Sequence, residues 1–125
     1  TEHEVILSEA QQRAVDDAYA RIKQAGYAPP SLAEIEAEIG PALVTYLIES
    51  DFLVRVAPDL AYESGVFAEM QERVVAFIRE HQQATVAEIR DLLGTSRRYT
   101  LALLETLDQR RITRRLGDNR VLRSG

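Results

Sequence analysis

The sequence predicts a mostly α-helical fold with small β-hairpins (α+β), arranged as two tandem winged-helix modules. Three observations predict it: an internal repeat, apolar residues at helical spacing before each copy, and a pair of short strand candidates after each copy. The chain has 125 residues, which suits two modules of about 60 residues each. We expect one module in residues 1–63 and the other in 64–125. A single six-helix bundle is the alternative, but it leaves both hairpin patterns unexplained.

The internal repeat marks a short second helix in each module. SLAEIEAEIG, residues 31–40, aligns with TVAEIRDLLG, residues 85–94, at a constant offset of 54. Apolar residues recur in both copies at the spacing of one helix face. Each copy ends at a glycine, Gly40 or Gly94, and glycine favours the left-handed conformation of a helix C-cap.

A long first helix, a third helix and a hairpin complete each module. The first helices are indicated by apolar residues at helical spacing: Val15, Ala18, Ile22 and Ala25 in one module, and Phe67, Met70, Val74, Phe77 and Ile78 in the other. Ser8 suits the start of the earlier helix and Gly26 its end. The strand candidates are FLVRV and LAY in the first module, and ITRRL and RVL in the second. This order of elements is that of a helix-turn-helix with a β-hairpin wing.

The two copies differ at the third helix, which lies in the nucleic-acid groove in most helix-turn-helix proteins. Aligning the hairpins through Asp59 and Asp118 gives an offset of 59, so the second copy has five additional residues before its wing. The third helix of the first copy starts with Pro41 and is largely apolar. That of the second is entered through TSRRY, residues 95–99, so binding is expected in the second module.

The charge of the chain is divided unequally between its halves. Residues 1–65 hold four basic and twelve acidic residues, a net charge of −8, whereas residues 66–125 hold eleven arginines and eight acidic residues, a net charge of +3. The second half has no lysine. Arginine has a planar fork that binds phosphate and guanine edges through paired hydrogen bonds. A nucleic-acid partner therefore belongs to the second half.

The basic residues gather at two places, the start of the third helix and the wing. At the helix start, free N–H groups favour phosphate, and the hydroxyl of Thr95 would add a donor. In the wing, Arg114 and Arg115 must point to opposite faces of their strand. The alternative is a solvated surface that acidic neighbours balance: Asp91, Glu105, Asp108 and Asp118. Tyr99 could stack on a base, although packing beneath the helix is the favoured interpretation.

Other function classes find little support in the sequence. The absence of cysteine excludes disulfides, iron–sulfur ligation and thiol catalysis. No P-loop motif is present, and the two histidines have no metal-binding neighbours. We therefore expect no catalytic residues, no metal site and no cofactor in this chain. A membrane span and a signal peptide are not indicated, so a cytoplasmic protein is expected, and Thr1 suggests a fragment of a larger one.

Residues 85–123 resemble the last winged-helix module of the bacterial selenocysteine-specific elongation factor, SelB. The resemblance rests on the combination of AEIRDLLGTSRRY, TRR in the first wing strand, and GDNRVL at the turn. Residues 1–65 resemble the preceding module of that family only in architecture. The family consists of translational GTPases with four C-terminal winged helices. The resemblance implies that this chain is the last two of them, and that the last one binds a selenocysteine-insertion (SECIS) hairpin in messenger RNA for delivery of selenocysteinyl-tRNA at a UGA codon.

The resemblance also implies RNA contacts at particular residues. They are Arg90 of the second helix, then Ser96, Arg97, Arg98 and Tyr99 at the start of the third, and Arg115, Gly117, Asp118 and Arg120 of the wing. GTP and Mg²⁺ would be bound by the parent protein, which would also contact the ribosome and selenocysteinyl-tRNA. Two other functions stay open: a DNA-binding winged-helix regulator and a protein-interaction module. Palindromic DNA calls for a two-fold dimer, whereas the RNA-binding function predicts a monomer.

Overall fold

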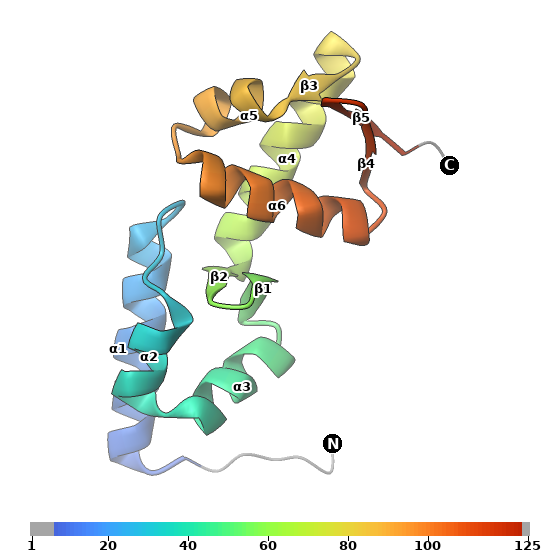
Figure 1. Ribbon diagram of the computed structural model, residues 1–125. Helices are drawn as coiled ribbons and strands as arrows, with labels where there is room; N and C mark the ends of the chain where they lie inside the picture. Colours follow the sequence, from blue (N-terminus) through green and yellow to red (C-terminus); the bar gives the residue numbers. More distant parts are fainter. Residues whose placement is uncertain (1–6, 124–125) are drawn as a thin grey trace.

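The computed structural model describes residues 7–123, and in them the winged-helix fold occurs twice in succession (Figure 1). The first copy comprises α1 (Glu9–Ala25), α2 (Leu32–Ile39), α3 (Pro41–Glu49), β1 (Leu53–Ala57) and β2 (Leu60–Glu63). The second comprises α4 (Ser64–His81), β3 (Ala84–Thr85), α5 (Val86–Leu93), α6 (Arg97–Gln109), β4 (Thr113–Leu116) and β5 (Asn119–Leu122). The predicted mixed fold, mostly helical with small hairpins, is confirmed.

Each copy ends in an antiparallel hairpin, and the second hairpin gains a third strand. The register pairs Leu53 with Glu63 in the first hairpin and Thr113 with Leu122 in the second. The two-residue strand β3 pairs with β5, which gives the strand order β3-β5-β4. The sequence analysis missed β3, because a strand of this length has no periodicity and is defined only by its partner.

The predicted helix boundaries have identifiable physical causes. Ser8 Oγ accepts a hydrogen bond from the backbone N–H of Gln11 at 3.1 Å, and the backbone N–H of Ser8 donates one to Oε1 of Gln11 at 3.0 Å. Gly94 ends α5 in the left-handed conformation (φ 66°, ψ 36°). Gly40 ends α2 as predicted but does not adopt the predicted left-handed helical conformation: its φ of 88° and ψ of 155° allow α3 to begin at the next residue.

The additional residues of the second copy lie in its third helix and in the turn before it. Helix α6 has 13 residues, whereas α3 has 9. Thr95 and Ser96 separate Gly94 from α6, but no residue separates Gly40 from α3. The longer helix carries the arginines at its start away from the apolar body of the module.

Two groups of buried side chains form the interior, and the first hairpin lies between them. The core of the first copy is built by α1, α2, α3 and residues of the hairpin. The core of the second includes Tyr62 of β2, with Tyr27, Val54 and Val56 packed against it. All four residues of β2 are buried. The first wing is therefore packed against α4 and α6 and does not project into solvent as the second wing does (Figure 1).

Glu63 joins the two copies at the point where β2 ends and α4 begins. Its carboxylate accepts a hydrogen bond from the Tyr19 hydroxyl at 2.6 Å and another from the backbone N–H of Val66 at 3.1 Å. Burial alone would raise the pKa of Glu63. The hydrogen bonds from Tyr19 and from the backbone of Gly65 and Val66 outweigh burial, so the pKa lies below its ordinary value of 4.5. The same contact with Glu63 raises the pKa of Tyr19 to about 12.

The pKa of Glu63 predicts how stability depends on pH. A carboxyl group with a lowered pKa stabilises the fold above its ordinary pKa, and this contribution is lost as the pH falls through the folded value. Glu63→Gln should therefore reduce the free energy of unfolding at pH 7 by about 1.5–3 kcal/mol. The deficit should shrink below pH 4.5. Urea unfolding at pH 7 and at a pH below 4.5 measures this difference in unfolding free energy. Glu49→Gln, at an exposed position, is the control, and a deficit independent of pH would contradict the assignment.

Candidate nucleic-acid interface

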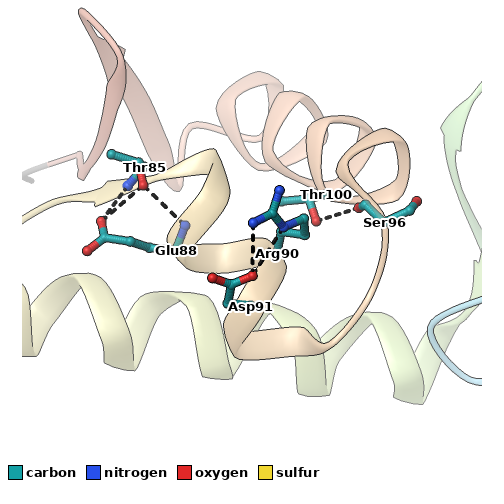
Figure 2. Close-up of polar contacts among 6 residues, drawn as sticks. All are labelled: Thr85, Glu88, Arg90, Asp91, Ser96 and Thr100. Carbon is teal, nitrogen blue, oxygen red and sulfur yellow. Dashed lines mark hydrogen bonds and ion pairs between the residues drawn. The ribbon is translucent and has the colours of Figure 1, made fainter.

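The start of α6 presents charge and hydrogen-bond donors to solvent. Ser96 caps the helix by accepting a hydrogen bond from the backbone N–H of Tyr99 at 3.2 Å, and its carbonyl accepts from the Thr100 hydroxyl at 2.8 Å (Figure 2). The backbone N–H groups of Arg97 and Arg98 have no acceptor within residues 7–123. Both arginine side chains are exposed and form no ion pair in this part of the chain. The helix start therefore favours an anion.

The second wing places one arginine of each strand on its inner face. Arg115 lies opposite Arg120 in the hairpin, and Arg114 lies opposite Val121. Because cross-strand partners share a face, Arg114 and Arg115 point in opposite directions, as predicted. The turn at Gly117 has φ +63°, and the carbonyl of this glycine accepts a hydrogen bond from Nε of Arg115 at 2.9 Å.

The helix start and the wing meet at one groove of about 290 Å³. Arg97 of α6 lies on one side, and Arg115 and Asp118 of the wing lie on the other. The remaining lining residues are Thr85, Val86, Ala87, Leu101, Glu105 and Arg120. The sequence analysis did not predict the wall formed by residues 85–87, because it depends on the pairing of β3 with β5. On its solvent side the groove presents two arginines, Arg97 and Arg115, and two carboxylates, Glu105 and Asp118. It therefore suits a polar ligand that offers both hydrogen-bond acceptors and donors.

Arg120 is at the base of this groove and is turned into the protein. The residue is 4 % exposed, and its guanidinium pairs with the Asp108 carboxylate at 3.0 Å through Nη2 and at 3.1 Å through Nε. Asp108 also accepts a hydrogen bond from the Thr113 hydroxyl at 2.6 Å. In this position Arg120 supports the wing, and we leave it out of the proposed RNA contacts. The sequence analysis treated Arg120 as a surface residue because its partner is twelve positions away.

The other predicted site residues do not line the groove. Arg90 hydrogen-bonds to the Asp91 carboxylate at 3.0 and 3.1 Å, and its side chain remains 40 % exposed (Figure 2). Tyr99 is half-buried, and the Arg98 guanidinium lies 5.9 Å from the centre of its ring. The hydroxyl of Thr95, expected as a phosphate donor, instead donates to the carbonyl of Tyr27 in the first copy at 3.4 Å.

The described residues provide two further findings. Among residues 7–123, no three side chains of His, Asp or Glu come together in a group that could hold a metal ion. In the same part of the chain, no helix has both the length and the apolar character needed to cross a bilayer.

Comparison with known proteins finds similarity to selenocysteine-specific elongation factors in sequence and in fold. Residues 76–122 match the family model described as elongation factor SelB, winged helix. A selenocysteine-specific elongation factor from Desulfomicrobium baculatum is 30 % identical over 106 residues, which cover 80 % of this chain and 17 % of that protein. The chain therefore spans about a sixth of the length of this curated relative.

Two solved structures share the fold over nearly the whole chain. The mRNA-binding domain of elongation factor SelB from E. coli, solved in complex with SECIS RNA, has a TM-score of 0.78 and 22 % identity, covering 94 % of this chain and all of that one. A bacterial selenocysteine-specific elongation factor, EF-Sec, has a TM-score of 0.72 and 20 % identity, covering 98 % of this chain and 21 % of that one. At these identities the likeness concerns the fold.

Proposed function

We propose, from the match of residues 76–122 to the winged-helix family model of elongation factor SelB, that the chain is an RNA-binding fragment of a selenocysteine-specific elongation factor. In this proposal the second module, residues 64–125, binds a SECIS hairpin in messenger RNA. The first module, residues 1–63, is acidic and acts as a spacer. The E. coli SelB domain solved with SECIS RNA supports the choice of ligand.

The observation that carries the proposal is the groove where Arg97 and Arg115 face each other across α6 and the wing. Phosphate contacts from these arginines, from Arg98 and from the free N–H groups of α6 would supply affinity and set the register. Sequence recognition requires unpaired bases, because the major groove of A-form RNA is too deep and narrow for side chains. An unpaired base of the hairpin would occupy the groove, next to Arg115 and Asp118.

The remaining functions are assigned to the parent protein. The fragment itself catalyses no reaction and acts as a monomer. GTP and Mg²⁺ are bound outside this chain, where the parent also contacts the ribosome and selenocysteinyl-tRNA in the cytoplasm. The relatives named as elongation factors, of which this chain covers 17 % and 21 %, support this division.

Binding of the 125-residue chain to RNA tests the proposal. A pool of hairpins with randomised loops provides one hairpin by selection for binding, which we call the selected hairpin, and a loop-scrambled copy provides the control. Fluorescence anisotropy should show tighter binding to the selected hairpin than to the scrambled one. For each tenfold rise in salt concentration, the logarithm of the binding constant should fall by about 0.7–0.9 per phosphate contact. Failure to select any hairpin, or equal binding to duplex DNA of the same length, would overturn the proposal.

Substitution of Asp118 tests whether this residue of the wing only forms the turn or contacts the RNA. It is exposed at the turn and lines the groove, where a carboxylate weakens phosphate binding but can accept a hydrogen bond from a base amino group. Asp118 does not position Arg120, whose guanidinium pairs with Asp108. We expect Asp118→Asn to keep the turn and the preference for the selected hairpin, with equal or tighter binding. A collapse of this preference at unchanged melting temperature would show that Asp118 contacts a base.

A further inference from the structure

The loop between α1 and α2 reaches the turn that precedes α6 (Figure 1). Tyr27 lies in this loop, and its carbonyl oxygen accepts the hydrogen bond from the Thr95 hydroxyl at 3.4 Å. Thr95 directly precedes Ser96, the capping residue of α6. A contact from the first module therefore ends two residues before Arg97.

The Tyr27 side chain is anchored on α4 of the second module. Its hydroxyl donates to the Glu69 carboxylate and accepts a hydrogen bond from Nη1 of Arg73 at 3.1 Å. The Arg73 guanidinium also lies 5.8 Å from the centre of the Tyr27 ring, and its Nη2 donates to the carbonyl of Leu92 at 2.8 Å. Leu92 belongs to the last turn of α5. Arg73 thus connects α4, α5 and the loop of the first module through one side chain.

Tyr62 contacts the same loop from the first hairpin. Its hydroxyl donates to the Tyr27 carbonyl at 3.4 Å, so that one oxygen receives hydrogen bonds from both Tyr62 and Thr95. Tyr62 is 1 % exposed. Burial raises the pKa of Tyr62, and the nearby Tyr99 adds to the rise. Because Tyr99 is in the first turn of α6, the contact network lies directly beneath the start of the RNA-binding helix.

We propose that Tyr27 is a positioning residue for RNA binding: it holds the turn at Gly94 and Thr95 and thereby fixes Arg97 and Arg98 relative to the wing. This inference rests on the proposed function, because it concerns the same groove. A site held in its binding geometry loses less conformational freedom when the ligand binds. The acidic first module therefore increases RNA affinity without contacting the RNA.

Variants of the 125-residue chain binding to the selected hairpin test this proposal. Tyr27→Ala should lose affinity by about threefold to tenfold, the effect of one hydrogen-bonded contact. Its salt dependence should equal that of the unmodified chain, because the number of phosphate contacts does not change. Tyr27→Phe keeps the ring and the carbonyl but lacks the hydroxyl, so it should lose less. The control is Tyr46→Ala, which removes a ring that packs near Phe52 within the first module, and it should bind as the unmodified chain does.

Thr95→Val provides an independent measurement if Tyr27→Ala does not fold. It removes the donor to the Tyr27 carbonyl at nearly constant shape. Tyr27→Phe loosens the side-chain anchor on Glu69 and Arg73, whereas Thr95→Val removes the hydrogen bond to the Tyr27 carbonyl. In the double variant the losses should not multiply if the anchor acts on α6 through that hydrogen bond. Multiplying losses, or a Tyr27→Ala affinity equal to that of Tyr46→Ala, would overturn the positioning role. If Arg97→Ala also leaves binding unchanged, the proposed function itself fails, which separates the two failures.

Discussion

Arg97→Ala is expected to weaken binding of the selected hairpin about tenfold to a hundredfold, the effect of losing a charged hydrogen bond of about 1.5–3 kcal/mol. Arg97 is exposed, unpaired within residues 7–123, and common to the helix start and the groove. If its partner is a phosphate, the loop-scrambled hairpin should lose a similar factor. The slope of affinity against salt should then become shallower by about one phosphate contact.

The control for Arg97→Ala is Arg13→Ala, which makes the same change of net charge at an exposed position of α1. Anisotropy titrations at several salt concentrations give both the affinity and the slope. A local contact predicts that only the Arg97 variant is affected. Equal losses in both variants would indicate that the overall charge, and not the groove, governs binding.

Asp108→Ala should have the largest effect on stability, about 3–5 kcal/mol of unfolding free energy, because it leaves a buried arginine without a counter-charge. The Arg120 side chain is 5 % exposed and that of Asp108 25 %. The substitution also removes the acceptor of the Thr113 hydroxyl, which is fully buried. Guanidinium chloride unfolding monitored by circular dichroism measures the loss.

Two comparisons make the Asp108 result specific. Asp91→Asn breaks a pair with Arg90 whose side chains are 73 % and 40 % exposed, so it should cost less than about 1 kcal/mol. The double variant Asp108→Ala/Arg120→Met removes both charges and should recover part of the stability lost in Asp108→Ala. If Asp108→Ala is no less stable than Asp91→Asn, the pair does not stabilise the wing.

Local patterns in the sequence were sufficient to predict most elements of the fold. The spacing of Val15, Ala18 and Ile22 follows one face of α1, and all three are buried. Gly94 ends α5 with positive φ, as the sequence analysis expected of a helix C-cap, and the predicted turn at Gly117 joins the two strands of the wing. These features depend on neighbours within a few residues, and the sequence displays such neighbours directly.

Features that depend on distant partners could not be predicted in the same way. Tyr62 alternates with its neighbours as in any half-exposed hairpin, and its burial follows only when α4 and α6 pack over the first wing. Arg120 is a basic residue in a basic wing and so resembles a binding residue. Its neighbours in the sequence do not show that it pairs with the carboxylate of Asp108. The hydroxyl of Thr95 is likewise used by Tyr27, 68 positions earlier in the chain. Of the RNA contacts that the resemblance implies, Arg97, Arg115 and Asp118 are exposed and line the same groove.

The junction at Glu63 limits how such modules could be exchanged between genes. The Glu63 carboxylate accepts one hydrogen bond from the Tyr19 hydroxyl of α1 and another from the Val66 N–H of α4. Helix α4 begins at the residue after β2. A recombination joint directly before or after Glu63 would replace either α1 or α4, and Glu63 would lose the hydrogen-bond donor of the replaced helix. A newly joined module would have to supply both a hydroxyl and a helix start in register. We therefore expect the two modules to be transplanted more readily as a pair than singly, because a joint at Glu63 separates its carboxylate from one of these two donors.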